Sequence, residues 1–219
     1  MKPLIIANWK CHPTTLIEAK GLFNSVKKGI KDLKNVEIVI CPPFVFLPFL
    51  KSKIGSQDCF WGESGAFTGE ISPKMLKNLG CEYVIIGHSE RRRYQKETDE
   101  IINKKLKAAI SSGLKPILCI ESLAQLKKGL KGIAKKVIIA YEPVFAIGTG
   151  KPCSPEKARK MRKAIKYPVV LYGGSVNSQN AVNYIKEAGF QGLLVGGASL
   201  NPKEFIALAK NIDFISKKR

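Results

Sequence analysis

Most apolar runs along the chain are short and continuous rather than alternating with polar residues. Such runs are typical of strands buried on both faces of a parallel sheet. Amphipathic segments with helical spacing lie between many of them. The pattern predicts strands at Leu4–Ala7, Val36–Cys41, Ser56–Asp58, Tyr83–Ile86, Lys115–Ile120, Val137–Tyr141, Val169–Tyr172 and Gly192–Val195. It predicts helices at Leu16–Lys28, Asp99–Ser112, Glu156–Lys166, Gln179–Ala188 and Lys203–Asn211.

Three helix starts carry a capping residue followed by proline: Ser72-Pro73, Ser154-Pro155 and Asn201-Pro202. The side-chain oxygen of the first residue can accept a hydrogen bond from a free N–H of the first turn. Proline fits the next position because its missing donor has no partner there. These pairs therefore predict where three helices begin.

Eight units of about 27 residues each favour a closed (β/α)₈ barrel over residues 1–219, with no linker to divide it into domains. An open, doubly wound sheet would also alternate strands and helices, but eight evenly spaced units fit it less well. Between the fifth and sixth strands, the sixteen residues 121–136 contain two glycines, so the helix of that unit is predicted to be short. In such barrels, functional groups lie just after the carboxyl ends of the strands.

The charge balance favours anionic partners, because 37 Lys and Arg against 17 Asp and Glu leave a net charge of +20. The charge is spread along the chain, whereas nucleic-acid-binding proteins concentrate it on one face. We therefore predict no nucleic-acid partner. The apolar runs are too short to cross a membrane, and the amino-terminal one is too short for a signal peptide. A cytoplasmic protein without a membrane partner is the expectation.

The six cysteines and two histidines show no metal-binding spacing. No CxxC pair occurs, and two histidines leave no convincing zinc site. The cysteines are interpreted mainly as buried thiols in a reducing compartment. We expect neither a bound metal nor a cofactor.

Polar and glycine-rich segments follow five of the predicted strands. Asn8-Trp9-Lys10 follows the first, Gly87–Arg92 the fourth, and Glu142-Pro143 the sixth. Glycine pairs follow the seventh and eighth strands, at 173–174 and 196–197. One lysine, one histidine and one glutamate are thus predicted to face two glycine-rich turns at one mouth of the barrel.

Several motifs, in this order, resemble the triosephosphate isomerase family over nearly the whole chain. They are NWK near the start, GAFTGEIS (Gly65–Ser72), GHSERR (Gly87–Arg92), AYEPVFAIGTG (Ala140–Gly150), LYGGSV (Leu171–Val176) and LLVGGASL (Leu193–Leu200). The resemblance implies a cofactor-free enzyme of glycolysis and gluconeogenesis that interconverts dihydroxyacetone phosphate and D-glyceraldehyde 3-phosphate through an enediolate.

The resemblance also implies a role for individual residues. Glu142 is the base, His88 a neutral electrophile and Lys10 an electrostatic stabiliser, and residues 143–150 form a lid. We expect burial to raise the pKa of Glu142 towards neutrality, and the helix after His88 to keep its imidazole uncharged. Substrate binding is assigned to Asn8, Lys10, Gly148, Ser175, Gly196 and Gly197. Supporting positions are Glu90, which pairs with Lys10 or Arg91, and Tyr172. A homodimer is expected, with Thr68 and Cys11 at its interface, and a tetramer is possible.

Two positions depart from the family pattern. Phe145 stands where the family has tryptophan, and Ser122 where it has glutamate. Those two family residues contact each other when the lid is open, so we expect apolar packing of Phe145 to replace a polar contact. The alternatives to an isomerase are another phosphate-binding barrel enzyme, such as a sugar-phosphate epimerase, and a basic nucleic-acid-binding protein with an inactive barrel.

Overall fold

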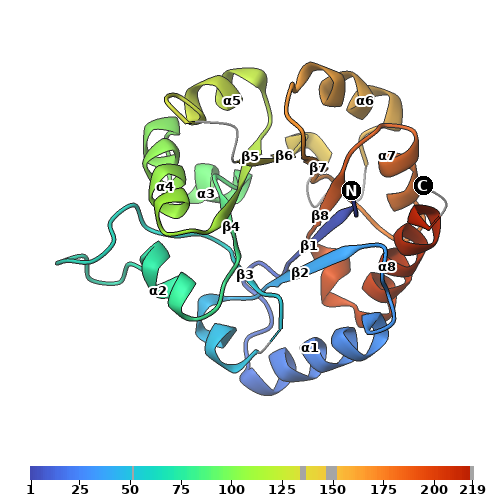
Figure 1. Cartoon of the computed structure of the whole chain (residues 1–219), viewed down its shortest axis with the longest axis horizontal. Helices are drawn as coiled ribbons and strands as arrows, with labels where there is room; N and C mark the ends of the chain where they lie inside the picture. The colour runs from blue at the N-terminus through green and yellow to red at the C-terminus, as the bar shows by residue number, and fades with distance from the viewer. Residues whose placement is uncertain (51, 134–136, 147–151, 218–219) are drawn as a thin grey trace.

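Eight parallel strands form a barrel in the computed structural model, which describes all residues except 51, 134–136, 147–151 and 218–219 (Figure 1). Hydrogen-bonded neighbours follow the order β2-β1-β8-β7-β6-β5-β4-β3. A parallel bridge between Ile40 and Ile54 joins the two ends of this order, so the barrel is nearly closed. The strands are β1 (Leu4–Asn8), β2 (Glu37–Cys41), β3 (Gly55–Ser56), β4 (Tyr83–Ile86), β5 (Lys115–Ile120), β6 (Ile138–Tyr141), β7 (Val170–Tyr172) and β8 (Gly192–Val195).

Helices surround the barrel on its outer side (Figure 1). The α-helices are α1 (Leu16–Ile30), α2 (Pro73–Asn78), α3 (Ser89–Tyr94), α4 (Asp99–Ser111), α5 (Leu123–Gly129), α6 (Pro155–Ala164), α7 (Ala181–Lys186) and α8 (Pro202–Ser216). Three 3₁₀ helices are η1 (Phe44–Phe49), η2 (Val144–Ala146) and η3 (Gly197–Leu200). The short helix predicted between β5 and β6 is α5, with seven residues.

The structure confirms the barrel, and most element boundaries lie within two residues of the prediction. Ser72, Ser154 and Asn201 each accept a hydrogen bond from the first turn of their helix, as predicted. The third strand, Gly55–Ser56, begins one residue and ends two residues before its predicted bounds, and the Ser56 hydroxyl donates to the Asp58 carbonyl where the chain turns. The last helix runs five residues beyond its predicted end.

The hydrophobic core has two layers separated by the sheet. In β1, Leu4 and Ile6 belong to a cluster within the barrel, whereas Ile5 and Ala7 belong to the larger cluster beneath the helices. Alternate residues of a strand point to opposite faces, so continuous apolar strands are needed to fill both layers. Five of the six cysteines are buried and Cys11 is exposed. The interpretation as mainly buried thiols is thus confirmed for the side-chain positions.

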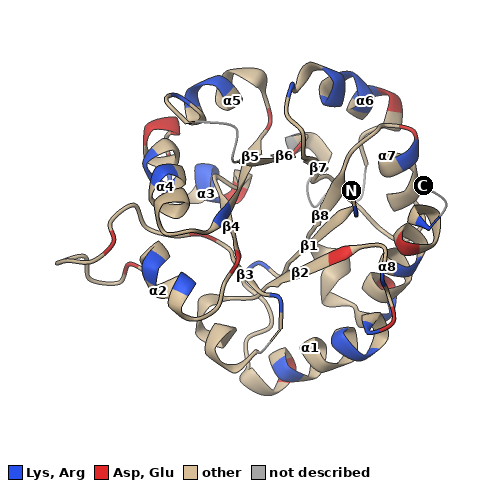
Figure 2. Ribbon diagram, viewed as in Figure 1, with Lys and Arg blue, Asp and Glu red and all other residues tan. Residues whose placement is uncertain are grey.

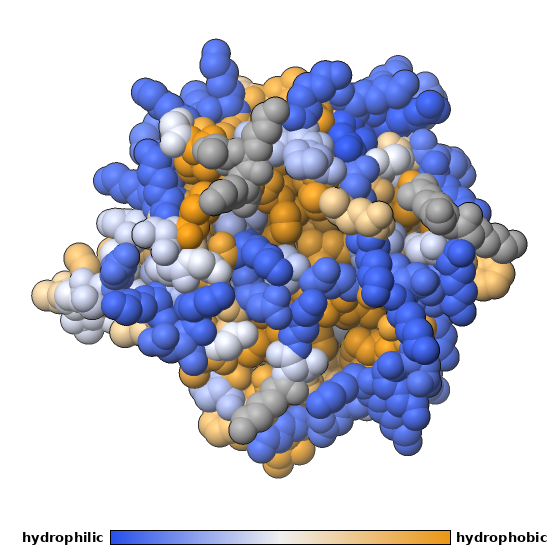
Figure 3. Space-filling view, in the orientation of Figure 1, coloured by the Kyte–Doolittle hydropathy of each residue, from blue (hydrophilic) through white to orange (hydrophobic). Residues whose placement is uncertain are grey.

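The charged residues are distributed around the molecule. Lysine and arginine occur on nearly all the peripheral helices (Figure 2), and hydrophilic side chains cover most of the viewed face around apolar ones near its middle (Figure 3). Within the described residues, no helix is both long enough and apolar enough to span a membrane. The positive charge is thus spread over the helices, as its even distribution along the sequence predicts.

Candidate active site

A cavity of about 240 Å³ lies at the carboxyl ends of five strands. β1, β4, β6, β7 and β8 each contribute residues to it, as expected for a parallel barrel. Asn8, Lys10, His88, Glu142, Ser175, Gly196 and Gly197 meet here; all were candidates from the sequence. Gly148 was also a candidate, but it lies outside the described residues. The lining residues that sequence reasoning missed are Val176, Asn177, Leu194 and Ala198. Val176, Leu194 and Ala198 lie within the quoted motifs and Asn177 directly follows one, so the strand-end rule could have found them.

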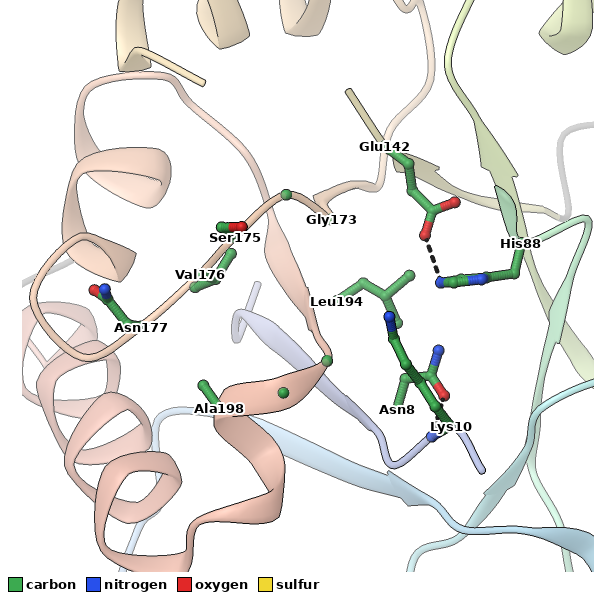
Figure 4. Close-up of a pocket in the computed structure, with 13 residues that line it drawn as sticks. Asn8, Lys10, His88, Glu142, Gly173, Ser175, Val176, Asn177, Leu194 and Ala198 are labelled. Atoms are coloured by element: carbon green, nitrogen blue, oxygen red, sulfur yellow. Dashed lines mark hydrogen bonds and ion pairs between the residues drawn. The ribbon is translucent and has the colours of Figure 1, made fainter. Parts of the chain in front are cut away.

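Glu142 and His88 face each other across one side of the cavity (Figure 4). Glu142 follows β6 and is held by its N–H, which donates to the Ile120 carbonyl at 2.8 Å. Its Oε1 lies 3.0 Å from Nε2 of His88. Its Oε2 accepts from the Ser89 N–H at 3.0 Å. Both side chains are buried, so these contacts replace water around the carboxylate.

The hydrogen bonds of His88 fit a neutral imidazole with its proton on Nε2. His88 is the capping residue of α3, and its Nδ1 accepts from the Glu90 N–H at 3.3 Å. A ring nitrogen that accepts carries no proton, so this bond assigns the proton to Nε2, whereas the Glu90 Oε2 atom at 3.5 Å from Nδ1 favours a proton there. Nε2 points at Glu142 and into the cavity. The start of α3 therefore selects the tautomer that can donate to a ligand.

The pKa of Glu142 is shifted in the direction opposite to the expectation. Burial is the largest single influence and raises it, as expected. His88, the Ser89 N–H and the Lys10 ammonium together outweigh burial and hold the pKa of Glu142 below its ordinary value. The expectation was wrong for this arrangement because it considered burial without the contacts made by the carboxylate.

The pKa of His88 is shifted upwards. Burial is again the largest influence and lowers it, but the nearby Glu142 and Glu90 carboxylates raise the pKa of His88 above its ordinary value. The bond from α3 to Nδ1 favours the neutral ring, as expected, while the contact with Glu142 opposes it. The charge state of His88 thus depends on what occupies the position beside Nε2.

Lys10 extends from the end of β1 towards the middle of the cavity (Figure 4). Its backbone φ is 56°, in the left-handed region that residues other than glycine seldom adopt. Its N–H donates to Asn8 Oδ1 at 3.0 Å, and its Nζ lies 2.5 Å from Glu90 Oε1. The sequence left open whether Glu90 pairs with Lys10 or Arg91; the structure places it against Lys10. Arg91 contacts other carboxylates.

Two glycine-rich turns face Lys10 from the other side of the cavity. Gly196 precedes η3 and Gly197 begins it. A Cβ at Gly196 would lie 3.1 Å from Lys10 Cε, whereas no atom of the described part of the chain lies within 4 Å of a Cβ at Gly197. The Ser175 N–H donates to the Ala146 carbonyl at 3.0 Å, and its hydroxyl donates to the same oxygen. Because glycine has no side chain, the backbone amides of these turns can approach an anion closely.

Tyr172 is not among the residues that line the cavity. It is fully buried, its hydroxyl accepts from the Cys153 N–H at 3.2 Å, and its ring stacks on Tyr184 at 3.7 Å between centroids. The Tyr184 hydroxyl donates to the Cys153 carbonyl at 2.6 Å. Sequence reasoning missed Tyr184, because nothing in its helical pattern distinguishes it from an ordinary core residue.

The two positions that depart from the family pattern lie in different surroundings. Phe145 is 61% exposed, and its expected apolar packing against the lid stays a prediction, because residues 147–151 lie outside the described part of the chain. The Ser122 hydroxyl accepts from the Gln125 N–H and caps α5. Ser122 therefore has a local role at a helix start.

Thr68 and Cys11 are both exposed. Thr68 belongs to the segment 61–70, which projects from the barrel between β3 and α2 (Figure 1). Phe60 supports the base of this segment, with ring centroids 4.1 Å from Trp61 and 4.7 Å from Phe67. Among the described residues, no group of three or more His, Cys, Asp or Glu is arranged to hold a metal ion.

The comparisons with known proteins agree on one family. A family model described as Triosephosphate isomerase matches residues 3–212. A triosephosphate isomerase of Caldanaerobacter subterraneus subsp. tengcongensis is 44% identical over 242 aligned residues, which cover 93% of this chain and 97% of the relative. One from Dictyoglomus turgidum is 42% identical with the same coverage. One from Dehalococcoides mccartyi (strain CBDB1) is 40% identical, with all of both chains covered.

Proposed function

We propose a division of catalytic roles from the premise that this chain belongs to the triosephosphate isomerase family. The chain interconverts dihydroxyacetone phosphate and glyceraldehyde 3-phosphate, a reaction of glycolysis. The reaction moves one proton between two adjacent carbons and a second proton between the oxygens that these carbons carry, so that the carbonyl changes place. It needs a base, a donor to the oxygen that becomes negative, and a site for the phosphate.

Glu142 is the base in this proposal. Its ionised carboxylate takes the proton from the carbon next to the substrate carbonyl, and the C–H electron pair forms the enediolate. The carboxylic acid then returns the proton to the neighbouring carbon. In the present arrangement, Glu142 is held by His88 and Ser89, contacts that keep its pKa low. Substrate must displace these contacts, and their loss in a dry cavity raises the pKa and strengthens the base.

His88 donates its Nε2 hydrogen to the substrate carbonyl oxygen. The contacts of the two ring nitrogens support this assignment, because Nδ1 accepts from the start of α3 and Nε2 faces the cavity. A substrate oxygen takes the place that Glu142 Oε1 occupies at 3.0 Å. The donor is then in position before charge develops, so little reorganisation is needed in the transition state.

Lys10 and the glycine-rich turns bind the anionic part of the substrate. The Lys10 ammonium places a positive charge near both the phosphate and the developing oxyanion. The amides of Gly196, Gly197 and Ser175 provide donors, and Ser175 exchanges its bond to Ala146 for one to phosphate. Asn8 orients Lys10. The roles of Gly148 as a phosphate contact and of residues 143–150 as a lid rest on the sequence motif, since residues 147–151 lie outside the described part of the chain.

A cytoplasmic homodimer is the proposed assembly, and a tetramer is an alternative. Support comes from the exposed segment 61–70, which carries Thr68 and the half-exposed Phe67 away from the barrel. A second cavity of about 330 Å³, partly lined by Cys11, lies beside the catalytic one and could receive this segment from a second copy. Sedimentation velocity distinguishes a monomer, dimer and tetramer, and a monomer over the whole concentration range would reject the assembly.

The contact between Glu142 and His88 carries the proposal, because it places the base beside the electrophile in a cavity faced by phosphate-binding turns. The test is exchange of the substrate C1 proton with solvent deuterium. Glu142→Gln should abolish the exchange while the chain stays folded. Glu187→Gln, at an exposed position of the α7 end, is the matched control and should exchange normally. Exchange that persists in Glu142→Gln would remove Glu142 from the role of base.

A further inference from the structure

We infer that Gln57 is a positioning residue that holds the backbone of Lys10 in its left-handed conformation and so aims the ammonium into the active site. The inference rests on the proposed role of Lys10. Gln57 follows β3, and its side-chain Nε2 donates to the Lys10 carbonyl at 2.8 Å. The two residues are 47 positions apart in the chain.

The conformation of Lys10 needs support from outside the residue. At a φ of 56°, the Cβ of an L-residue crowds the neighbouring carbonyl, and lysine has no short polar group to relieve this by bonding locally. Asn8 Oδ1 accepts the Lys10 N–H, which fixes the peptide before the Cα. Gln57 binds the Lys10 carbonyl, which fixes the peptide after it. Together, the two amide side chains determine both backbone dihedrals.

Gln57 is also anchored to the barrel. The same Nε2 donates to the Cys41 carbonyl at 2.8 Å, and that carbonyl accepts the Trp9 N–H at 3.1 Å. Cys41 ends β2, and Trp9 directly follows β1. A side-chain amide nitrogen carries two hydrogens, so both donors of Gln57 are used. The Lys10 carbonyl is thereby tied to the end of a strand rather than to a loop.

The position of the Lys10 side chain depends on this backbone. The stem passes close to Gly196, where an added Cβ would lie 3.1 Å from Lys10 Cε. The ammonium lies 2.5 Å from Glu90 Oε1 and lines the catalytic cavity. A relaxed backbone with negative φ would change the direction of the Cα–Cβ bond. The charge would then leave the place where phosphate and oxyanion are expected.

A double-mutant cycle tests whether Gln57 acts through Lys10. Gln57→Met keeps the length of the side chain and removes both donors, and Lys10→Met removes the charge. We expect Gln57→Met to lower kcat/KM about tenfold, equivalent to about 1.4 kcal/mol. In the Lys10→Met background, the same change should have less than about a twofold effect, because residues that act as one unit are not additive.

Gln191→Met is the matched control. Gln191 lies next to β8, and its Nε2 also donates to a backbone carbonyl, that of Gly189 at 2.7 Å. It lies at the amino end of its strand, away from the cavity. Its replacement should change kcat/KM less than about twofold in either background, whatever its effect on urea unfolding.

The outcomes separate the inference from the proposed function. If Lys10→Met retains kcat/KM, the role of Lys10 fails. If Lys10→Met is impaired and Gln57→Met multiplies the loss, or has no effect alone, the positioning role of Gln57 fails while the function stands. Should Gln57→Met not fold, the cycle is run with Gln57→Asn. That variant keeps the donors but shortens their reach. The positioning role of Gln57 again fails if Gln57→Asn multiplies the loss of Lys10→Met or has no effect alone.

Discussion

Replacing Asp58 with asparagine should stabilise the folded chain at neutral and alkaline pH. Asp58 follows β3 and is almost completely buried in a cluster with Glu97, Arg91 and Lys105. Its Oδ2 contacts Lys105 Nζ at 2.7 Å and an Arg91 nitrogen at 2.9 Å, while its Oδ1 has no hydrogen-bond partner among the described residues. Burial raises the pKa of Asp58 from 3.8 to about 6 despite the two cations, and Glu97 adds to the rise.

The magnitude follows from the link between proton binding and folding. Between pH 4 and 6, the folded state binds a proton at Asp58 that the unfolded state has lost, so stability falls as the pH rises. A rise in pKa from 3.8 to about 6 corresponds to about 3 kcal/mol at neutral pH, at about 1.4 kcal/mol per pKa unit. Asparagine resembles the neutral acid in shape, and Glu97 remains as a partner for both cations.

Urea unfolding of the two chains from pH 4.5 to pH 8 measures the effect. The difference between Asp58→Asn and the unaltered chain should grow from about 1 kcal/mol at pH 4.5 to about 3 kcal/mol in favour of asparagine above pH 7. The difference isolates Asp58, since groups whose pKa is lowered, such as Glu37, affect both chains alike. A difference that does not depend on pH would refute the reasoning, as would a less stable Asp58→Asn chain at pH 8.

Three further results are expected. Glu142→Gln should lower the pKa of His88, measured by NMR of the imidazole, because it removes the carboxylate that raises it; an unchanged titration would contradict the contact. Gly192→Ala should prevent stable folding, seen by circular dichroism, because its Cβ would lie 2.0 Å from the Leu4 carbonyl oxygen. Gly21→Ala is the matched control: nothing lies within 4 Å of that position in α1, so unfolding should show a gain of about 0.5–1 kcal/mol, and a loss would count against the open space described.

The architecture could be predicted from local patterns. Continuous apolar runs place residues such as Leu4 and Ile5 in different layers of the core, and a parallel sheet is the arrangement that buries both faces. Cap-proline pairs located three helix starts. The predicted end of β3 was two residues too late, because a two-residue strand carries little pattern and the turn after Ser56 involves a side-chain hydrogen bond.

Most of the candidate site could also be predicted, because the carboxyl ends of parallel strands meet at one face whatever lies between them in sequence. That rule, together with the family motifs, predicted that Lys10, His88 and Glu142 share one site. The rule could not predict whether the pKa of Glu142 is raised or lowered, because that depends on contacts of about 3 Å with His88 and Ser89.

By itself, the sequence determined the repeating units, the mouth of the barrel where the chemistry lies, and the residue types present there. The tertiary structure decided the pairing of Glu90 with Lys10, the tautomer of His88, and the links made by Gln57 and Asp58. The physical reason is one of scale. Hydrophobic burial follows residue type and period, whereas a hydrogen bond depends on distances of a few tenths of an ångström between residues far apart in the chain.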